Sequence, residues 1–132
     1  TIWRDYLTDC QQQVKRVTEP RALLRTSAQA IRNFARVYPA RYAVMMQYQL
    51  RPTDAEEVEI IKTSLHMFQQ ALQLYELSED ALIDVMRMIN AAIYGFITRE
   101  NSELMTLNRS TDASYEVMLD ALLVAIEYIQ QN

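Results

Sequence analysis

Cysteine, glycine and histidine are almost missing from this sequence, and their scarcity excludes several kinds of structure. The 132 residues contain one Cys, one Gly, one His and three Pro. Cys10 alone cannot form an internal disulfide, and it fits a small buried residue in a reducing compartment better than a reactive thiol. With so few turn-forming residues, and with frequent Ala, Leu, Met, Gln and Glu, the chain is predicted to be all-α.

Motifs of the common enzyme classes are also missing. The sequence has no Gly-rich phosphate loop and no plausible Ser/His/Asp or Cys/His arrangement. His66, the single histidine, falls on the polar side of its predicted helix and cannot by itself supply the Glu-x-x-His pairs of a di-iron helical bundle. We therefore expect the protein not to be an enzyme and to hold neither a metal nor another cofactor.

No uninterrupted apolar run approaches the roughly 18 residues of a membrane span, and the N-terminus has no basic and apolar signal pattern. These features predict a soluble, cytoplasmic protein without a membrane partner. The net charge of −4 is unevenly divided, because residues 1–52 carry nine Lys or Arg against three Asp or Glu. Without a compact basic cluster, however, the chain is not expected to bind DNA by itself.

Apolar periodicity predicts about six helices. Pro39 should break the chain between the second and third, and Ser78 should cap the fifth. In the second helix, Arg21, Arg25, Arg32 and Arg36 should form a solvated face or, alternatively, an anion-binding or interdomain surface. The expected helices span 1–17, 21–37, 40–49, 53–75, 81–100 and 112–129, with Thr18 capping the second, Thr111 or Asp112 capping the last, and a polar connection over 101–111.

The last two helices are apolar around most of their circumference, and only a narrow strip of the fifth, with Asp84, Arg87 and Thr98, is suited to water. One subunit cannot easily cover two such helices. We expect them to form a four-helix bundle across a homodimer. The predicted interface residues are Val85, Met88, Ala92, Gly95, Arg99, Val117, Ala121, Val124, Ala125 and Tyr128.

Seven Met and eight Tyr are many for a chain of this length, and Met adapts to irregular guests. If the second to fifth helices pack together, several of these side chains converge on an apolar cavity with a few polar groups, the general form of a small-molecule site. The alternative is that they form a solid core. The predicted ligand-binding residues are Phe34, Tyr42, Met45, Met46, Leu65, Phe68, Met86, Asn90 and Tyr94.

Three stretches in this order carry a family resemblance: FARVYPARYAVM at 34–45, IYGFI at 93–97 with Glu100, and DASY at 112–115. They resemble the C-terminal, effector-binding and dimerisation domain of the tetracycline-repressor (TetR) family of transcriptional regulators, in the subgroup with a hydrophobic-His-Gly motif. Two positions depart from that pattern, because Tyr94 stands where the subgroup usually has His and Arg99 replaces an apolar residue.

The resemblance implies one effector-binding and dimerisation domain over 1–132, in which residues 1–17 form the linker helix from a helix-turn-helix domain that should precede Thr1 and is absent from this chain. A small apolar or aromatic ligand would then change the spacing of two DNA-binding domains, so DNA is a partner only through the absent domain. The alternative function is a helical protein-interaction or dimerisation module with a solid core and no small-molecule ligand.

Overall fold

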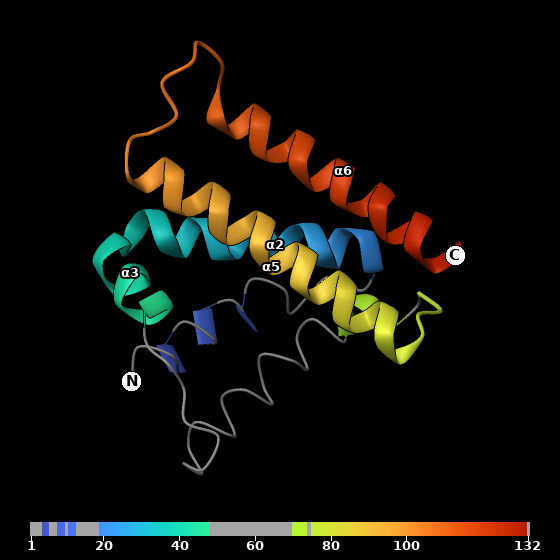
Figure 1. Cartoon of the computed structure of the whole chain (residues 1–132). Coiled ribbons are helices and arrows are strands. Elements are labelled where there is room, and N and C mark those ends of the chain that lie inside the picture. The colour runs from blue at the N-terminus through green and yellow to red at the C-terminus, as the bar shows by residue number, and fades with distance from the viewer. Residues whose placement is uncertain are drawn as a thin grey trace. The chain divides into compact units, whose positions relative to one another are not determined.

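A computed structural model describes residues 4–5, 8–9, 11–12, 19–47, 70–73 and 75–131. Over these residues the chain is helical with no strand, so the all-α prediction is confirmed. Figure 1 shows the bounded helices, which are α2 (Pro20–Val37), α3 (Pro39–Gln47), α5 (Glu79–Asn101) and α6 (Thr111–Gln131). Most of the predicted helix at 53–75, with Leu65 and Phe68, lies outside the described residues. The chain divides into two compact units, Thr1–Gln73 and Leu74–Asn132, and the prediction of one domain over 1–132 stays a prediction.

The start of α2 is fixed by Glu19 and Pro20. The two carboxylate oxygens of Glu19 accept hydrogen bonds from the backbone N–H groups of Arg21 (3.1 Å) and Ala22 (2.7 Å). Pro20 occupies the first turn, where a missing N–H costs nothing. The cap is therefore Glu19, while the predicted cap Thr18 lies outside the described residues.

Pro39 separates α2 from α3, as predicted. α2 ends at Val37, and Tyr38 leaves the helical conformation with φ −126° and ψ 62° while its N–H still donates to the carbonyl of Phe34 at 2.8 Å. The ring of Pro39 disfavours a helical conformation for the residue before it, and its own fixed φ suits the first turn of a new helix. α3 accordingly starts at Pro39 itself and ends at Gln47.

The buried side of α2 includes Leu24, Ala28, Ile31 and Ala35, which repeat at three and four residues. The predicted arginine face is only partly solvated, because Arg21 and Arg36 are exposed but Arg32 is 2% exposed. The prediction is wrong at Arg32. This residue follows buried Ala28 by four positions and so lies beside the apolar side of the helix, where its long aliphatic stem can be covered.

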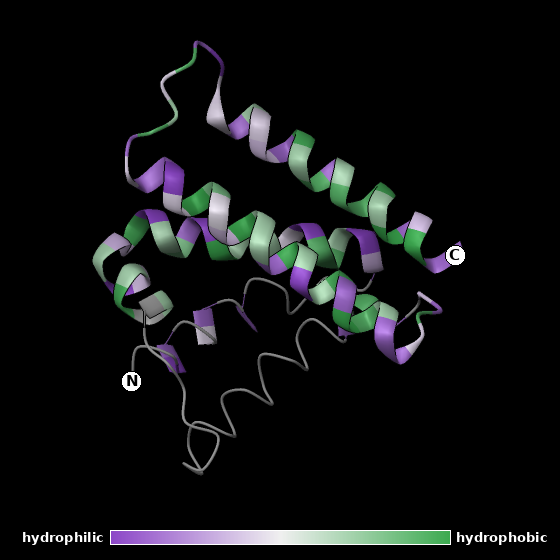
Figure 2. Cartoon of the chain, in the orientation of Figure 1, coloured by the Kyte–Doolittle hydropathy of each residue, from purple (hydrophilic) through white to green (hydrophobic). Residues whose placement is uncertain are grey.

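In the second unit, α5 begins at the predicted cap, since Ser78 Oγ accepts from the N–H of Ala81 at 3.1 Å. Its buried side is a single stripe with a spacing of four residues, and the predicted solvated strip of Asp84, Arg87 and Thr98 is exposed. Figure 2 shows polar segments alternating with apolar ones along α5. The buried stripe consists of Val85, Ile89, Ile93 and Ile97.

The last helix, α6, packs against α5 within this unit. Ser110, rather than the predicted Thr111 or Asp112, supplies the cap, because its Oγ accepts from the N–H of Ala113 at 3.2 Å. The rings of Phe96 on α5 and Tyr115 on α6 meet edge to face, with centroids 4.9 Å apart and an interplanar angle of 63°. The buried side of α6 consists of Tyr115, Leu119, Leu123 and Ile126.

Among the described helices, α5 is long and apolar enough to cross a membrane by length and composition alone. Only 22% of its most apolar window is buried within the chain. Its uncovered side nevertheless carries Asp84 and Arg87, and ionised side chains facing lipid are costly. This arrangement favours a helix that is covered by protein and water.

Candidate functional site

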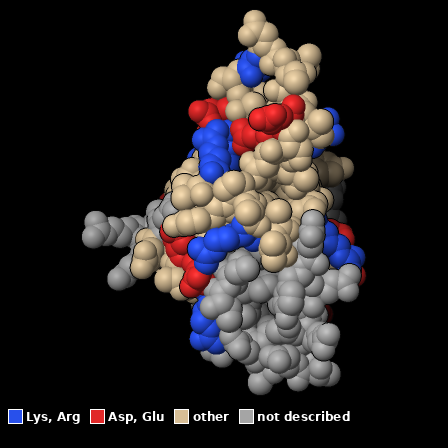
Figure 3. Space-filling view, turned by 90° about the vertical axis from the view of Figure 1, so that its left-hand side faces the viewer, with Lys and Arg blue, Asp and Glu red and all other residues tan. Residues whose placement is uncertain are grey.

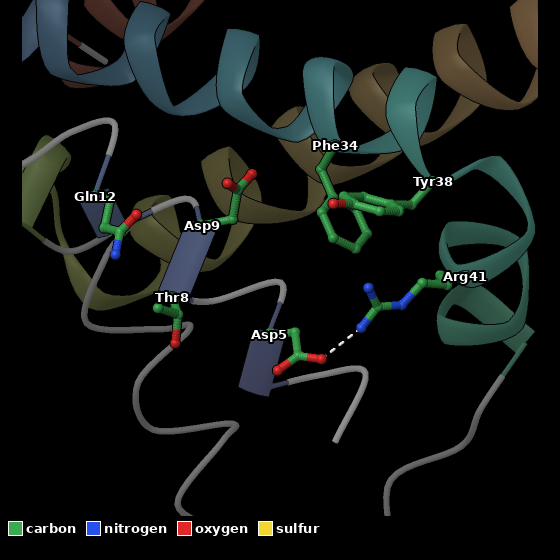
Figure 4. Close-up of a pocket in the computed structure, with 7 residues that line it drawn as sticks. All are labelled: Asp5, Thr8, Asp9, Gln12, Phe34, Tyr38 and Arg41. Atoms are coloured by element: carbon green, nitrogen blue, oxygen red, sulfur yellow. Dashed lines mark hydrogen bonds and ion pairs between the residues drawn. The ribbon is translucent and has the colours of Figure 1, made fainter.

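A cavity of about 330 Å³ lies in the first unit, where described residues near the N-terminus face the junction of α2 and α3. Figure 4 shows its walls, which come from three parts of the chain: the N-terminal segment, the last turn of α2 and its C-cap, and the first turn of α3. The cavity is open to solvent on one side and has both aromatic and charged walls. Its lining residues are Asp5, Thr8, Asp9, Gln12, Phe34, Tyr38 and Arg41.

Two aromatic rings form the apolar wall. Phe34 and Tyr38 are four residues apart, so both rings leave the same side of the α2 C-terminus. Their centroids are 5.3 Å apart and their planes are tilted by 46°. Phe34 is buried, whereas Tyr38 is exposed, so the wall offers one ring that is anchored in the core and one that a ligand can reach.

Arg41 joins the aromatic wall to the N-terminal segment. Its guanidinium carbon lies 5.0 Å from the centroid of the Tyr38 ring, a cation–π distance. Its Nη2 donates to Oδ2 of Asp5 at 2.5 Å, across 36 positions of sequence. The two side chains are 37% and 59% exposed, so the pair contributes little, about 0–1 kcal/mol, to stability. It is a contact that can be exchanged at small cost.

The polar wall has helical spacing. Asp5 and Asp9 are four residues apart, as are Thr8 and Gln12, and all four line the cavity. Thr8 Oγ1 donates to the carbonyl of Arg4 at 2.9 Å, one turn earlier, which is a helical pattern. These four residues therefore present carboxylate, hydroxyl and amide groups to a cavity whose other side is aromatic.

Among the described residues of the predicted ligand-binding set, Phe34 lines this cavity. Tyr42 is buried on α3, and Met46 on the same helix is half-buried. Met45 also belongs to α3, but its side chain is not among those that the structure describes. The rest of the predicted set belongs to the second unit or lies outside the described residues. Met86 is half-buried on α5, and Asn90 and Tyr94 are exposed, so the Asn90 amide can bond to water.

The sequence prediction missed the polar wall because it collected large apolar residues from helix faces. Asp5, Thr8, Asp9 and Gln12 repeat at three and four residues, which is a signal, but a solvated helix face has the same spacing. Arg41 carried a better signal, because it follows a Tyr-Pro break that turns the chain and brings its first-turn side chains back toward α2.

The predicted dimer residues on α6 form one uncovered face. Val117, Val124 and Tyr128 are 56%, 60% and 66% exposed, and Ala121 lies exposed between them. On α5, Met88, Ala92 and Gly95 are half-buried, Arg99 is exposed, and Val85 has no exposed surface with which to contact a second copy. Ala125 is half-buried at the border of the α6 face.

Charged side chains do not gather by sign on the face of the chain shown in Figure 3, where described basic and acidic groups are intermingled and separated by uncharged surface. In the part of the chain that the structure describes, no group of three or more His, Cys, Asp and Glu side chains could hold a metal ion.

A family model described as the tetracyclin repressor-like, C-terminal domain matches residues 24–122, which include α2 from Leu24 onward, all of α3 and α5, and the first half of α6. No curated protein and no solved structure gives a match. The matched stretch covers well over half of the chain and includes the aromatic wall of the cavity with Arg41. The chain therefore belongs to the family of tetracycline repressor-like C-terminal domains, which serve regulators in ligand binding and dimerisation.

Proposed function

We propose that this chain is the effector-sensing and homodimerisation domain of a TetR-type transcriptional repressor in the cytoplasm. It binds a small apolar or aromatic ligand, and binding controls the affinity for DNA of a helix-turn-helix domain on the N-terminal side of Thr1. Membership of the family supports a regulator with ligand-binding and dimerisation roles. The ligand and the allosteric coupling are the parts that go beyond it.

The position of the cavity is the observation that carries the proposal. One wall consists of Asp5, Thr8, Asp9 and Gln12, in the part of the chain that in this proposal leads toward the DNA-binding domain, and the other is the corner between α2 and α3. A molecule seated there contacts both. A ligand shifts an equilibrium only if it binds one state better than the other, and contacts to both walls give it that preference for one position of the segment.

The size of the cavity is at the lower end of the range for small-molecule sites. Small-molecule pockets have volumes of about 300–1,000 Å³ and combine apolar surface with a few polar groups. A volume of about 330 Å³ beside two aromatic rings fits a compact aromatic molecule. Further ligand contacts from Tyr42, Met45, Met46, Leu65, Phe68, Met86, Asn90 and Tyr94 stay predictions.

The homodimer in this proposal is supported by the uncovered face of α6. Val117, Val124 and Tyr128 are each more than half exposed and share one side of a helix whose opposite side is the core of its own unit. In a twofold dimer, this face of α6 packs against the same face of the second copy, with α5 alongside. These residues are then buried in a four-helix bundle. The shared axis then holds the two N-terminal segments at a distance that ligand can change.

A thermal-shift screen with a panel of aromatic compounds tests ligand binding, because a ligand that binds only the folded chain raises the melting temperature with its concentration. Tyr38→Ser should weaken the hits, since Tyr38 is an exposed wall of the cavity. Val44→Ser, which removes an exposed apolar side chain outside the cavity, should not. A screen without hits, or hits that Tyr38→Ser leaves unchanged, contradicts this site.

The coupling is tested by the distance between the two N-terminal segments of the dimer. A spin label at Gln11→Cys in a Cys10→Ser background marks an exposed position outside the cavity lining. Double electron–electron resonance spectroscopy should give a different distribution of distances between the two spin labels when a hit from the screen is bound. An identical distribution at saturating ligand would remove the allosteric part of the proposal.

A further inference from the structure

The guanidinium of Arg41 is held in the way that proteins hold a bound organic cation. It lies over the ring of Tyr38 at 5.0 Å and contacts the carboxylate of Asp5. An aromatic face and a carboxylate are the two groups that stabilise a positive charge away from bulk water. Figure 4 shows the Arg41 side chain reaching across from α3 toward Asp5, beside the rings of Tyr38 and Phe34.

The charges around the cavity favour cations over anions. Among the described residues, its lining contains two carboxylates, Asp5 and Asp9, and one guanidinium, Arg41. The rings of Phe34 and Tyr38 present negative π faces, and Thr8 and Gln12 can accept hydrogen bonds. An anion that reached Arg41 would have to displace Asp5 and remain beside two carboxylates. A cation, by contrast, meets attractive groups on both walls.

We infer that the cavity is a site for an aromatic organic cation. Its amidinium, guanidinium or ammonium group replaces the guanidinium of Arg41 beside Asp5, and its ring packs against the exposed ring of Tyr38. This inference rests on the proposed function, and it names the chemical class of the effector. Arg41 is then an internal occupant that the effector displaces.

The exchange is feasible because the resident pair is weak. Arg41 and Asp5 are 37% and 59% exposed, so the arginine can turn into water without leaving an unpaired charge buried. The exchange also has a structural consequence. The contact between Arg41 and Asp5 ties α3 to the N-terminal segment, and a cation that takes Asp5 releases that tie.

Three ligands of the same shape separate the charge classes: benzamidinium, benzamide and benzoate. Each is titrated into the chain and its Kd is measured by isothermal calorimetry or by NMR shifts. Benzamidinium should bind at least ten times more tightly than either of the others, and its binding should weaken with added salt because the site is partly exposed. Equal affinities for benzamidinium and benzamide would overturn the inference.

Two substitutions should change the affinity for benzamidinium in opposite directions if the cavity is a cation site. Arg41→Gln removes the competing guanidinium, so benzamidinium should bind several-fold more tightly; Asp5→Asn removes its partner and should weaken binding several-fold. Matched controls are Arg109→Gln and Asp84→Asn, which remove the same charges at exposed positions in the other unit and should leave Kd unchanged. Circular dichroism confirms that every variant has the wild-type helix content. Weaker or unchanged benzamidinium binding in Arg41→Gln overturns the inference.

The two proposals fail in different ways. If compounds in the screen bind and respond to Tyr38→Ser, but benzamidinium has no advantage over benzamide, the effector site stands and its cation class is wrong. If no compound in the screen binds and the spin labels do not move, the proposed function itself fails, and the cation class fails with it.

Discussion

The ring of Phe96 on α5 meets the ring of Tyr115 on α6 edge to face, 4.9 Å between centroids, in the core of the second unit. Tyr115 has no exposed surface, and Phe96 is half-buried. Buried aromatic pairs in this arrangement contribute about 0.5–1.5 kcal/mol beyond the apolar area that they bury. The contact joins α5 to α6 within the second unit.

A double-mutant cycle measures this pair. Phe96→Leu and Tyr115→Leu should each lower the free energy of unfolding by about 1–3 kcal/mol, with the larger loss at the fully buried Tyr115. The two losses should fail to add by about 0.5–1.5 kcal/mol, because either substitution alone already breaks the ring contact. Chemical denaturation gives these values, and Tyr94→Leu, at an exposed position of the same helix, is the control. Losses that add within about 0.3 kcal/mol would show that the rings do not interact.

Local features of the fold could be predicted from the sequence because their causes are local. Pro39 restricts the residue before it and starts a new helix, and Ser78 caps the backbone N–H three residues later. The family could be identified for a similar reason, since the stretches that carry the resemblance lie within the matched residues 24–122. Where several neighbouring residues can serve as a cap, the prediction was wrong, because Ser110 caps α6 in place of the predicted Thr111 or Asp112.

The candidate site was largely beyond prediction. It depends on a contact between Asp5 and Arg41, which are 36 positions apart, and no periodicity in the sequence records such a pairing. Its polar wall also has the spacing of an ordinary solvated face. Phe34 was found because it is apolar and at a helical position, whereas the groups that would recognise a ligand's charge were not.

Substitution of Arg32 tests the burial of the arginine at which the predicted solvated face is wrong. It is 2% exposed on α2, whereas Arg36, one turn later, is exposed. Arg32→Ala should lower the free energy of unfolding by roughly 2 kcal/mol or more, since it removes a buried side chain and strands the groups that it contacts. Arg36→Ala should stay within about 0.5 kcal/mol, the usual range for surface substitutions. Equal effects in thermal or urea unfolding would place Arg32 in solvent.

Substitutions of Gly95 distinguish the stability of the single chain from the stability of the dimer. Within the described part of the chain, a Cβ at this position would meet nothing within 4 Å outside its own helix. Gly95→Ala should therefore be accepted by the single chain, with a gain of up to about 1 kcal/mol from helix propensity. Gly95→Leu should keep the helix content but weaken the dimer at least tenfold, because the added side chain occupies space that we assign to the second copy. Light scattering over a dilution series checks this, and an unchanged mass for Gly95→Leu would mean that Gly95 has no packing role.

Val124 lies in the middle of the uncovered face of α6 and is 60% exposed. A carboxylate there costs the single chain little, because water can reach it. In a twofold interface the same substitution enters twice, and two like charges face each other without partners in an apolar seam. Val124→Glu is therefore expected to convert the dimer to a monomer with unchanged helix content, raising the dimer Kd at least a hundredfold by light scattering or sedimentation.

Leu107→Glu is the matched control, since Leu107 is 89% exposed in the connection between α5 and α6 and outside the predicted interface. Dissociation by both variants would point to a general effect of charge. A wild-type chain that stays monomeric at high concentration would leave the face of α6 without the partner assigned to it.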